Sequence, residues 1–198
     1  MEPLGREYFA RPALEVAPDL LGCMLVHRTS EGILSGMVVE TEAYGGVNDP
    51  ASHAFRGRRT ARNEVMWGPA GHAYIYPIYG IYLCLNIVTG QDGDPQGVFI
   101  RAVEPRTGLD AMARARGMAS DEKNIPRLAN GPSKLCIAFR ITREMSGSDV
   151  TNGPLFFTAG EETESITSKR IGIDYAGAAA EWPWRFLVKG SRFVSRRP

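Results

Sequence analysis

Two glutamates stand two positions apart in the apolar segment GMVVETEAY, residues 36–44. A strand alternates its side chains between two faces. The predicted faces are Val38, Glu40, Glu42 and Tyr44 on one side, and Val39, Thr41 and Ala43 on the other. A carboxylate among apolar neighbours costs free energy to bury, and such groups are candidates for acid–base chemistry. The segment therefore predicts a functional glutamate, with two acids facing water on an edge strand as the alternative.

Other polar residues could complete such a site. His53 follows Tyr44 by nine positions, and Arg101 lies in the apolar segment GVFIRAVEP. A glutamate, a histidine and an arginine near aromatic rings could form an acid–base site beside a flat pocket in which a ring stacks. Asn86 lies among apolar residues, where an amide needs a hydrogen-bond partner. It either ties a turn or contacts a ligand.

The segment YIYPIYGIYLCLN, residues 74–86, predicts two strands joined by a tight turn. Exposed hairpin turns favour Asn, Asp, Ser and Gly. This turn instead presents Tyr79 between two isoleucines, and Pro77 precedes it. An aromatic ring at the end of a hairpin is predicted to contact something outside the protein.

The bulk composition is that of an ordinary globular protein. The chain has 198 residues, 43% of them hydrophobic, and a formal net charge of +1. This is enough for one domain with its own core, predicted over residues 1–198. No apolar run approaches the ~18 residues that span a membrane, and no signal-like segment is present, so neither membrane insertion nor export is expected. The three cysteines are predicted to be reduced core thiols, and the three histidines make no metal-ligand spacing.

Arginine outnumbers lysine by 19 to 4, and the arginines are clustered. Four lie in RGRRTAR, residues 56–62, and others follow residue 182 in a stretch without aspartate or further glutamate. Guanidinium groups suit bidentate contacts with phosphates. A GC-rich genome also favours arginine codons, but it does not explain the clustering.

The order of predicted elements indicates an α+β fold. Helices are expected over 14–20, 107–117 and 131–141, with Thr107 as an N-cap, and strands over 22–28, 36–44, 72–78, 81–89, 97–105, 155–158, 170–175 and 185–190. Strands and helices do not alternate regularly. This favours a single domain with a curved, mostly antiparallel sheet, flanking helices and a protruding β-hairpin.

Five ordered blocks resemble the alkyladenine (3-methyladenine) DNA glycosylase family. The longest is VVETEAYGGVNDPASHAFRGRRTARNEVMWGPAGHAYIYPIYGIYLCLNIV, and GVFIRAVEP, NGPSKLCIAF, RIGIDYAG and PWRFLVKGSRFVS follow in the family's order. The resemblance covers nearly the whole chain. Pro77 departs from it, because the family is expected to carry an aliphatic residue there.

The resemblance implies a role for each matching residue. Glu42 would be the general base that activates a water, and Arg101 would help to hold that water and the Glu42 carboxylate. The pocket for an extruded base would be formed by Tyr44, His53, Tyr76 and Asn86. Tyr79 would fill the gap left in the duplex, because an enzyme that acts on a base must take it out of the stack. Phosphate contacts are expected from Arg58, Arg59, Arg192, Arg196 and Arg197.

The resemblance also implies the substrate and the reaction. The partner would be double-stranded DNA with damaged purines such as 3-methyladenine, hypoxanthine or ethenoadenine, and the enzyme would need no cofactor and no metal. The four lysines lie outside the blocks around Glu42, so base removal without strand cleavage is expected. A monomer is expected, placed in the cytoplasm with the nucleoid in a bacterium and in the nucleus in a eukaryote.

Two other functions fit parts of the sequence. A glycoside hydrolase could use Glu40 and Glu42 as its acid pair, since Cα atoms two apart on a strand are roughly 6.5–7 Å apart. Both would point the same way, however, instead of flanking a bond. A nucleic-acid-binding domain without chemistry would explain the arginines and the hairpin, but such a domain has no use for Glu42, which repels phosphate. Glu40→Gln is expected to be milder than Glu42→Gln.

Overall fold

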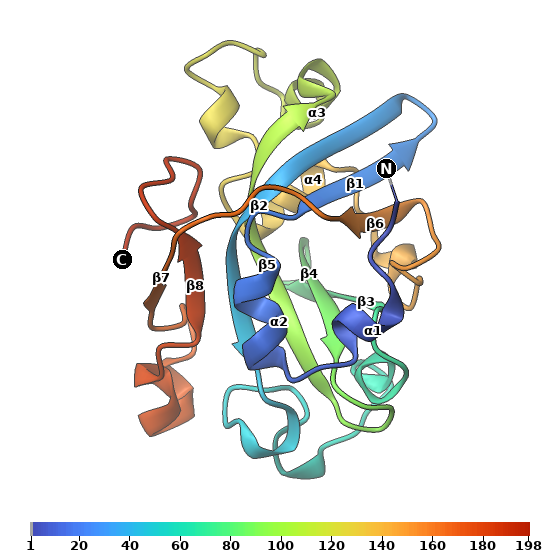
Figure 1. Cartoon of the computed structure of the whole chain (residues 1–198), viewed down its shortest axis with the longest axis vertical. Helices are drawn as coiled ribbons and strands as arrows, with labels where there is room; N and C mark the ends of the chain where they lie inside the picture. The colour runs from blue at the N-terminus through green and yellow to red at the C-terminus, as the bar shows by residue number, and fades with distance from the viewer. Residues whose placement is uncertain (1) are drawn as a thin grey trace.

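A long antiparallel sheet curls around the core of the protein (Figure 1). The computed structural model describes residues 2–198. Its strands are β1 (Met24–Thr29), β2 (Gly32–Tyr44), β3 (Ala73–Ile78), β4 (Tyr82–Thr89), β5 (Gln96–Thr107), β6 (Leu155–Thr158), β7 (Ser165–Ser168) and β8 (Arg185–Val188). The order across the sheet is β3-β4-β5-β2-β1-β6, and β8 joins β2 to β7. The two longest strands, β2 and β5, lie side by side in the middle.

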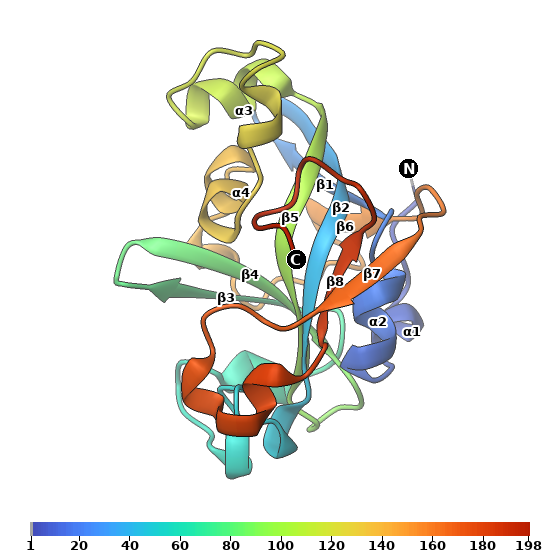
Figure 2. The same cartoon turned by 90° about the vertical axis from the view of Figure 1, so that its left-hand side faces the viewer.

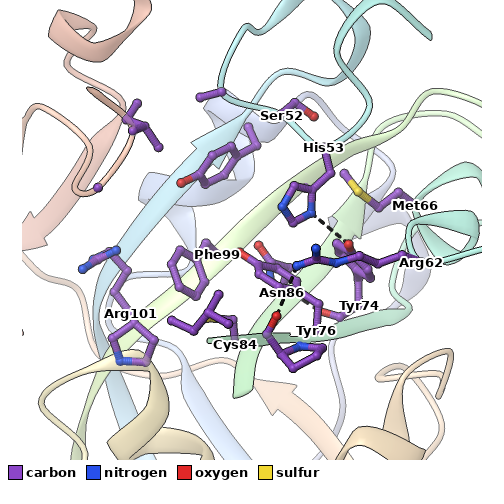
Figure 3. Close-up of a pocket in the computed structure, with 18 of the residues that line it drawn as sticks. Ser52, His53, Arg62, Met66, Tyr74, Tyr76, Cys84, Asn86, Phe99 and Arg101 are labelled. Atoms are coloured by element: carbon purple, nitrogen blue, oxygen red, sulfur yellow. Dashed lines mark hydrogen bonds between the residues drawn. The ribbon is translucent and has the colours of Figure 1, made fainter. Parts of the chain in front are cut away.

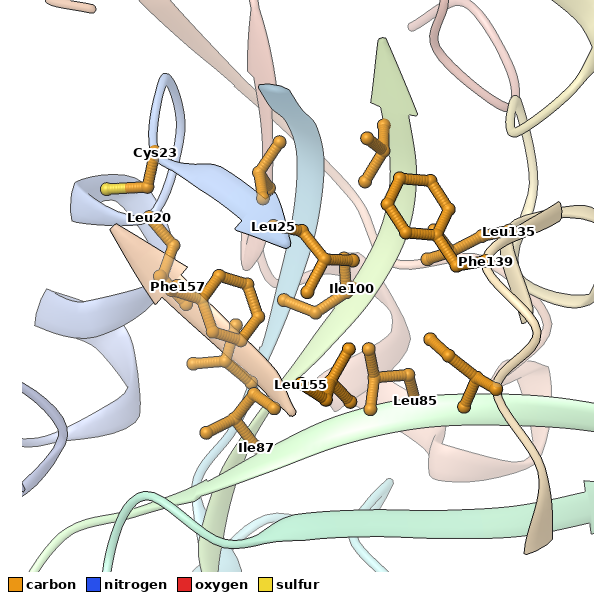
Figure 4. Close-up of a cluster of buried hydrophobic side chains, with 14 of the residues drawn as sticks. Leu20, Cys23, Leu25, Leu85, Ile87, Ile100, Leu135, Phe139, Leu155 and Phe157 are labelled. Carbon is orange, nitrogen blue, oxygen red and sulfur yellow. The ribbon is translucent and has the colours of Figure 1, made fainter. Parts of the chain in front are cut away.

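Four short α-helices lie against the sheet: α1 (Arg6–Phe9), α2 (Ala13–Asp19), α3 (Leu109–Ala115) and α4 (Pro132–Ala138). Apolar residues of α2, α4 and the strands meet in one main core (Figure 4). Its members include Leu20, Leu25, Leu85, Ile87, Ile100, Leu135, Phe139, Leu155 and Phe157. The prediction of a single α+β domain with a curved antiparallel sheet is confirmed. In residues 2–198, no helix has the length and apolar character to cross a membrane.

The hairpin of β3 and β4 projects from the body of the protein (Figure 2). Its backbone turns at Tyr79 and Gly80, whose φ angles are 49° and 77°. The Ile81 amide closes this turn by donating to the Ile78 carbonyl at 3.3 Å. Two successive positive φ angles are those of a type I′ turn, which favours Asn-Gly. Tyrosine at the first of these positions is a departure from local preference.

Pro77 lies in β3 without disturbing its pairing with Leu83 of β4. Strand β3 is at the edge of the sheet, and its alternate residues Ala73 and Ile75 direct their amides away from β4, toward residues 146–148. Pro77 continues this alternation, so its missing N–H faces the open edge and no ladder hydrogen bond is lost. Its carbonyl accepts a hydrogen bond from Arg62 at 3.2 Å.

The pairing of β2 with β5 is interrupted on both sides of Glu40. The register is Val38–Val103, Glu40–Ala102 and Thr41–Ile100. Val39 and Arg101 are therefore without opposite residues, which is the pattern of a β-bulge in each strand. Bulges reorient side chains and are frequent beside active sites. The two valines consequently exchange the predicted faces: Val38 joins the main core and Val39 a cluster with Phe193.

The short helix α1 was not predicted, and two predicted features differ from the structure. Helix α3 begins after Gly108, whose φ is 81°, and Thr107 is the last residue of β5 instead of an N-cap. The strand predicted over 170–175 is wrong: β7 lies earlier, at Ser165–Ser168. In the segment RIGIDY, residues 170–173 lie outside helices and strands, and Asp174 and Tyr175 begin a 3-10 helix. Arg170 and Ile171 bond to side chains of the site described below instead of to another strand.

Candidate active site

A cavity of about 700 Å³ lies beside the hairpin and next to the middle of the sheet (Figure 3). Its lining includes six residues predicted from the sequence: Tyr44, His53, Tyr76, Tyr79, Asn86 and Arg101. They come from β2, the loop after β2, the hairpin and β5, so only the fold brings them together. The segment Ile171–Ile173 and Tyr175 add a wall that was not predicted.

Glu42 is fully buried, and three groups that line the cavity bind its carboxylate. Its Oε1 accepts a hydrogen bond from the Ile171 amide at 2.8 Å and lies 3.3 Å from Nη1 of Arg101. Its Oε2 accepts one hydrogen bond, from the Tyr44 hydroxyl at 3.0 Å. A carboxylate oxygen has two lone pairs, so Oε2 retains capacity for one more donor.

Burial raises the pKa of Glu42 above its usual value of 4.5, and Arg101, the Ile171 amide and the Tyr44 hydroxyl oppose this without cancelling it. The desolvated carboxylate is thereby a better proton acceptor than one in water. Each of its three partners stabilises the ionised form. The arrangement is suited to a general base.

His53 is held as a neutral ring in the cavity wall. Its Nδ1 lies 2.9 Å from the Tyr74 hydroxyl, and its ring meets Tyr76 edge-on with centroids 4.6 Å apart. Burial, together with the charges of Arg62 and Arg58, lowers the pKa of His53 to about 4. The wall therefore offers polar contacts without adding a charge at neutral pH.

Arg170 connects the cavity wall formed by residues 171–173 and Tyr175 to the end of β2. Its guanidinium binds both carboxylate oxygens of Asp49, at 2.5 and 2.9 Å, and donates to the Ala43 carbonyl at 2.9 Å. Both charged side chains are fully buried. The guanidinium carbon also lies 4.8 Å from the centroid of the Tyr44 ring, with Trp182 and Trp184 at 5.8 and 5.0 Å. Arg170 thus holds Tyr44 on one side and the adjacent Ile171 amide on the other.

The comparisons with known proteins agree along nearly the whole chain. Residues 7–192 match the family described as methylpurine-DNA glycosylase (MPG). The chain belongs to the methylpurine-DNA glycosylase family. It is 46% identical to a protein of Clostridium acetobutylicum over 97% of both chains. It is also 49% identical to one of Methanocella arvoryzae, over 100% of this chain and 98% of the other. Both relatives are named provisionally as 3-methyladenine DNA glycosylases.

The family membership makes this chain a DNA-repair enzyme, a hydrolase that removes damaged bases from DNA. It excludes the two other functions that the sequence left open. The geometry also argues against a paired-acid glycoside hydrolase, because Glu40 and Glu42 share Arg101 instead of flanking a common space.

The arginines expected to contact phosphate in this DNA glycosylase differ in their surroundings. Arg58, Arg192, Arg196 and Arg197 are exposed. Arg59 is exposed too, but it forms a bidentate pair with Glu64, at 2.5 and 3.0 Å. A phosphate would have to compete with Glu64 for this guanidinium. Binding of phosphate by these five residues stays a prediction.

Several contacts of the glycosylase site were missed in the sequence. They come from Asp49, Arg170, Ile171, Arg185 and Ser195. The Ile171 contribution is a backbone amide, which carries no residue signal. Trp182 and Trp184 pack beside this site, with ring centroids 4.4 Å apart, and both lie near the guanidinium of Arg170.

We predict that Arg170→Met lowers the free energy of unfolding by about 3–5 kcal/mol, because it leaves Asp49 buried without its counter-ion. The matched control is Lys169→Met, which removes a cation whose pair with Glu181 is exposed. That change should stay within about 0.5 kcal/mol. Urea unfolding measures the free energy of unfolding of both variants. Equally small losses of this free energy would contradict a stabilising role for the buried pair of Arg170 and Asp49.

Proposed function

We propose that this glycosylase turns alkylated or deaminated purines out of duplex DNA and hydrolyses the N-glycosidic bond with a water activated by Glu42. The observation that carries the proposal is the carboxylate itself. Glu42 is buried, is held on one oxygen by Arg101 and the Ile171 amide, and lies directly behind a cavity walled by tyrosines. Few structural roles would require a charge in that position.

The proposed reaction moves one proton and two pairs of electrons. The water oxygen bonds to C1′ of the sugar while the bond from C1′ to the purine nitrogen breaks. The electron pair of the broken bond leaves with the base, and the proton of the water passes to Glu42. A neutral purine such as hypoxanthine leaves as its anion and takes a proton from solvent water. An alkylated purine carries positive charge and departs neutral, so the enzyme has to supply position, a proton acceptor and a negative charge near the developing oxocarbenium ion.

The cavity suits flat bases of more than one kind. Tyr44 and Tyr76 offer aromatic faces that attract a cationic base such as 3-methyladenine. Each ring already has an arginine near it, Arg170 at 4.8 Å from Tyr44 and Arg62 at 5.2 Å from Tyr76. These cations reduce the preference for a charged base, so neutral hypoxanthine and ethenoadenine are included among the proposed substrates. Asn86 borders the space and would crowd the exocyclic amine of normal guanine.

Tyr79 is proposed to occupy the gap left by the extruded nucleotide. Its side chain is 91% exposed, and its backbone is in the left-handed region that tyrosine rarely adopts. Such a conformation persists where function or surrounding structure maintains it. Unstacking a base costs a few kcal/mol, and an inserted ring offsets part of that cost.

The proposed enzyme leaves the DNA strand uncut. A lyase step needs an amine that attacks C1′, and among the described residues that line the cavity there is no lysine. We further infer that it acts as a monomer on double-stranded DNA with damaged purines. Its place in the cell would be with the chromosome, in the cytoplasm of a bacterium or the nucleus of a eukaryote.

Glu42→Gln should reduce single-turnover excision of hypoxanthine by about 10²–10⁴-fold, the range that a general base contributes. Affinity for the same duplex should stay within a few fold, since the base only accepts a proton. Glu104→Gln, the same substitution in β5 at a partly exposed ion pair, serves as control and should excise normally. Unimpaired excision by Glu42→Gln would refute the mechanism.

The pH dependence of excision should report the pKa of Glu42. The base works only when ionised, so the rate should rise through that pKa, and its raised pKa places the acidic limb above pH 4.5. A duplex with 3-methyladenine is the substrate of choice, because its cationic base needs no protonation. Tyr44→Phe keeps the ring and removes one donor to the carboxylate, so the limb should move to higher pH. An unchanged limb in Tyr44→Phe would speak against Glu42 as the titrating group.

Tyr79→Asn separates insertion into DNA from folding. Asparagine is favoured at this turn position, so the melting temperature should stay the same or rise slightly. Excision of hypoxanthine paired with thymine should fall roughly tenfold or more, the effect of about 1.4 kcal/mol of unstacking energy that is no longer offset. A mismatched lesion is already loosened and should be affected less. An equal loss on both duplexes would contradict insertion.

A further inference from the structure

Glu40 is bound more extensively than Glu42, the proposed base. Its Oε1 accepts hydrogen bonds from Nε of Arg101 at 3.0 Å, Nε of Arg185 at 2.9 Å and the Ser195 hydroxyl at 2.8 Å. Its Oε2 accepts the Ser195 amide at 2.5 Å. Glu40 has no exposed surface. The donors come from β5, β8 and the segment after β8, so this one carboxylate joins three parts of the chain.

Every nitrogen of the Arg101 guanidinium has a partner in this group. Nε donates to Glu40, Nη1 lies 3.3 Å from Glu42, and Nη2 donates to the Ser195 hydroxyl at 3.4 Å. A guanidinium is planar and rigid, so fixing two of its nitrogens fixes the third. Glu40 and Ser195 therefore determine where Nη1 lies relative to Glu42.

The segment after β8 has two further contacts besides those of Ser195. Phe193 is buried against Met37, Val39 and Ala102. Nη2 of Arg185 also donates to the carbonyl of Arg196, the residue after Ser195. Ser195 is thus fixed on both sides, and its position does not depend on Glu40 alone.

The four charges of the group sum to zero. Two carboxylates, Glu40 and Glu42, face two guanidinium groups, Arg101 and Arg185, and all four side chains are at most 8% exposed. Neutralising Glu40 would leave Glu42 as the single anion beside two cations. It would also remove a contact that orients the Arg101 guanidinium toward Glu42. The effect would appear at Glu42, although neither carboxylate is among the residues that line the cavity.

We propose that Glu40 is a positioning residue that, with Ser195, fixes Arg101 against Glu42, so that residues 193–195 form part of the active site. This rests on the proposed function of Glu42. The loss expected on Glu40→Gln remains smaller than that expected on Glu42→Gln. The two carboxylates and Arg101 are buried, and the bulges at Val39 and Arg101 lie where these groups meet.

A double-mutant cycle on the full chain tests the proposal. Single-turnover excision of hypoxanthine and affinity for the same duplex are measured for Glu40→Gln, Arg101→Gln and the double variant. Each single change should slow excision roughly 10- to 100-fold, since a displacement of about 1 Å at a reacting group costs on the order of 100-fold. The double variant should be no more than about threefold slower than Arg101→Gln alone. Losses that multiply would overturn the proposal, because Glu40 would then act without Arg101.

Ser195→Ala keeps the test decisive if Glu40→Gln fails to fold. It removes the hydroxyl that contacts Glu40 and Arg101, and excision should slow about three- to tenfold, the size of one hydrogen bond. Duplex affinity and melting temperature should be retained. Ser191→Ala is the matched control, because its hydroxyl only accepts the Phe193 amide. Equal rates for the two serine variants would overturn the proposal.

The wild-type chain distinguishes the two levels of failure. Free hypoxanthine released by the wild type, with multiplicative losses in the cycle, would leave the proposed function intact and remove only the role of Glu40. Absence of any released base from the wild type, on duplexes carrying each proposed lesion, would refute the proposed function itself.

Discussion

An anion removed from water must find its compensation inside the protein, and at Glu42 this requirement shapes much of the structure. Arg101 can approach it only because both central strands are bulged, and Arg101 is in turn neutralised by Glu40. Glu40 then needs Arg185 and the segment after β8. On the other side the Ile171 amide must be held, which Arg170 does by its pair with Asp49. The irregular parts of the chain are thus arranged around one carboxylate.

The sequence was informative where side-chain type and local periodicity decide the outcome. Alternation predicted β2 and the shared face of Glu40, Glu42 and Tyr44, and residue type singled out the tyrosine at the hairpin tip. It failed where a partner far along the chain decides. The bulge that exchanges Val38 and Val39 depends on pairing with β5, and periodicity assumes regular pairing. The segment RIGIDY has the composition of a strand, but its first two residues bind Asp49 and Glu42.

One side of the cavity is a buried and extensively bonded wall, and the other side is an exposed hairpin tip. The walls formed by Tyr44, His53 and Ile171 rest on buried ion pairs and hydrogen bonds, which fix their geometry before any ligand arrives. The hairpin tip is the reverse: Tyr79 and Ile81 are 91% and 74% exposed and contribute little to the core. Such a division is expected where a rigid pocket must receive a group that another part of the protein helps to displace.

Pro77 has a consequence for how copies of this protein behave toward one another. A tyrosine-rich edge strand is a template to which another chain can add by backbone pairing, and this is a common route to aggregation. Along β3 the outward amides of Ala73 and Ile75 are occupied by residues 146–148. The next outward position is Pro77, which has no amide to offer, and Arg62 occupies its carbonyl. The hairpin can therefore expose aromatic surface at its tip while the outer edge of β3 offers a foreign strand no free amide at residues 73, 75 and 77.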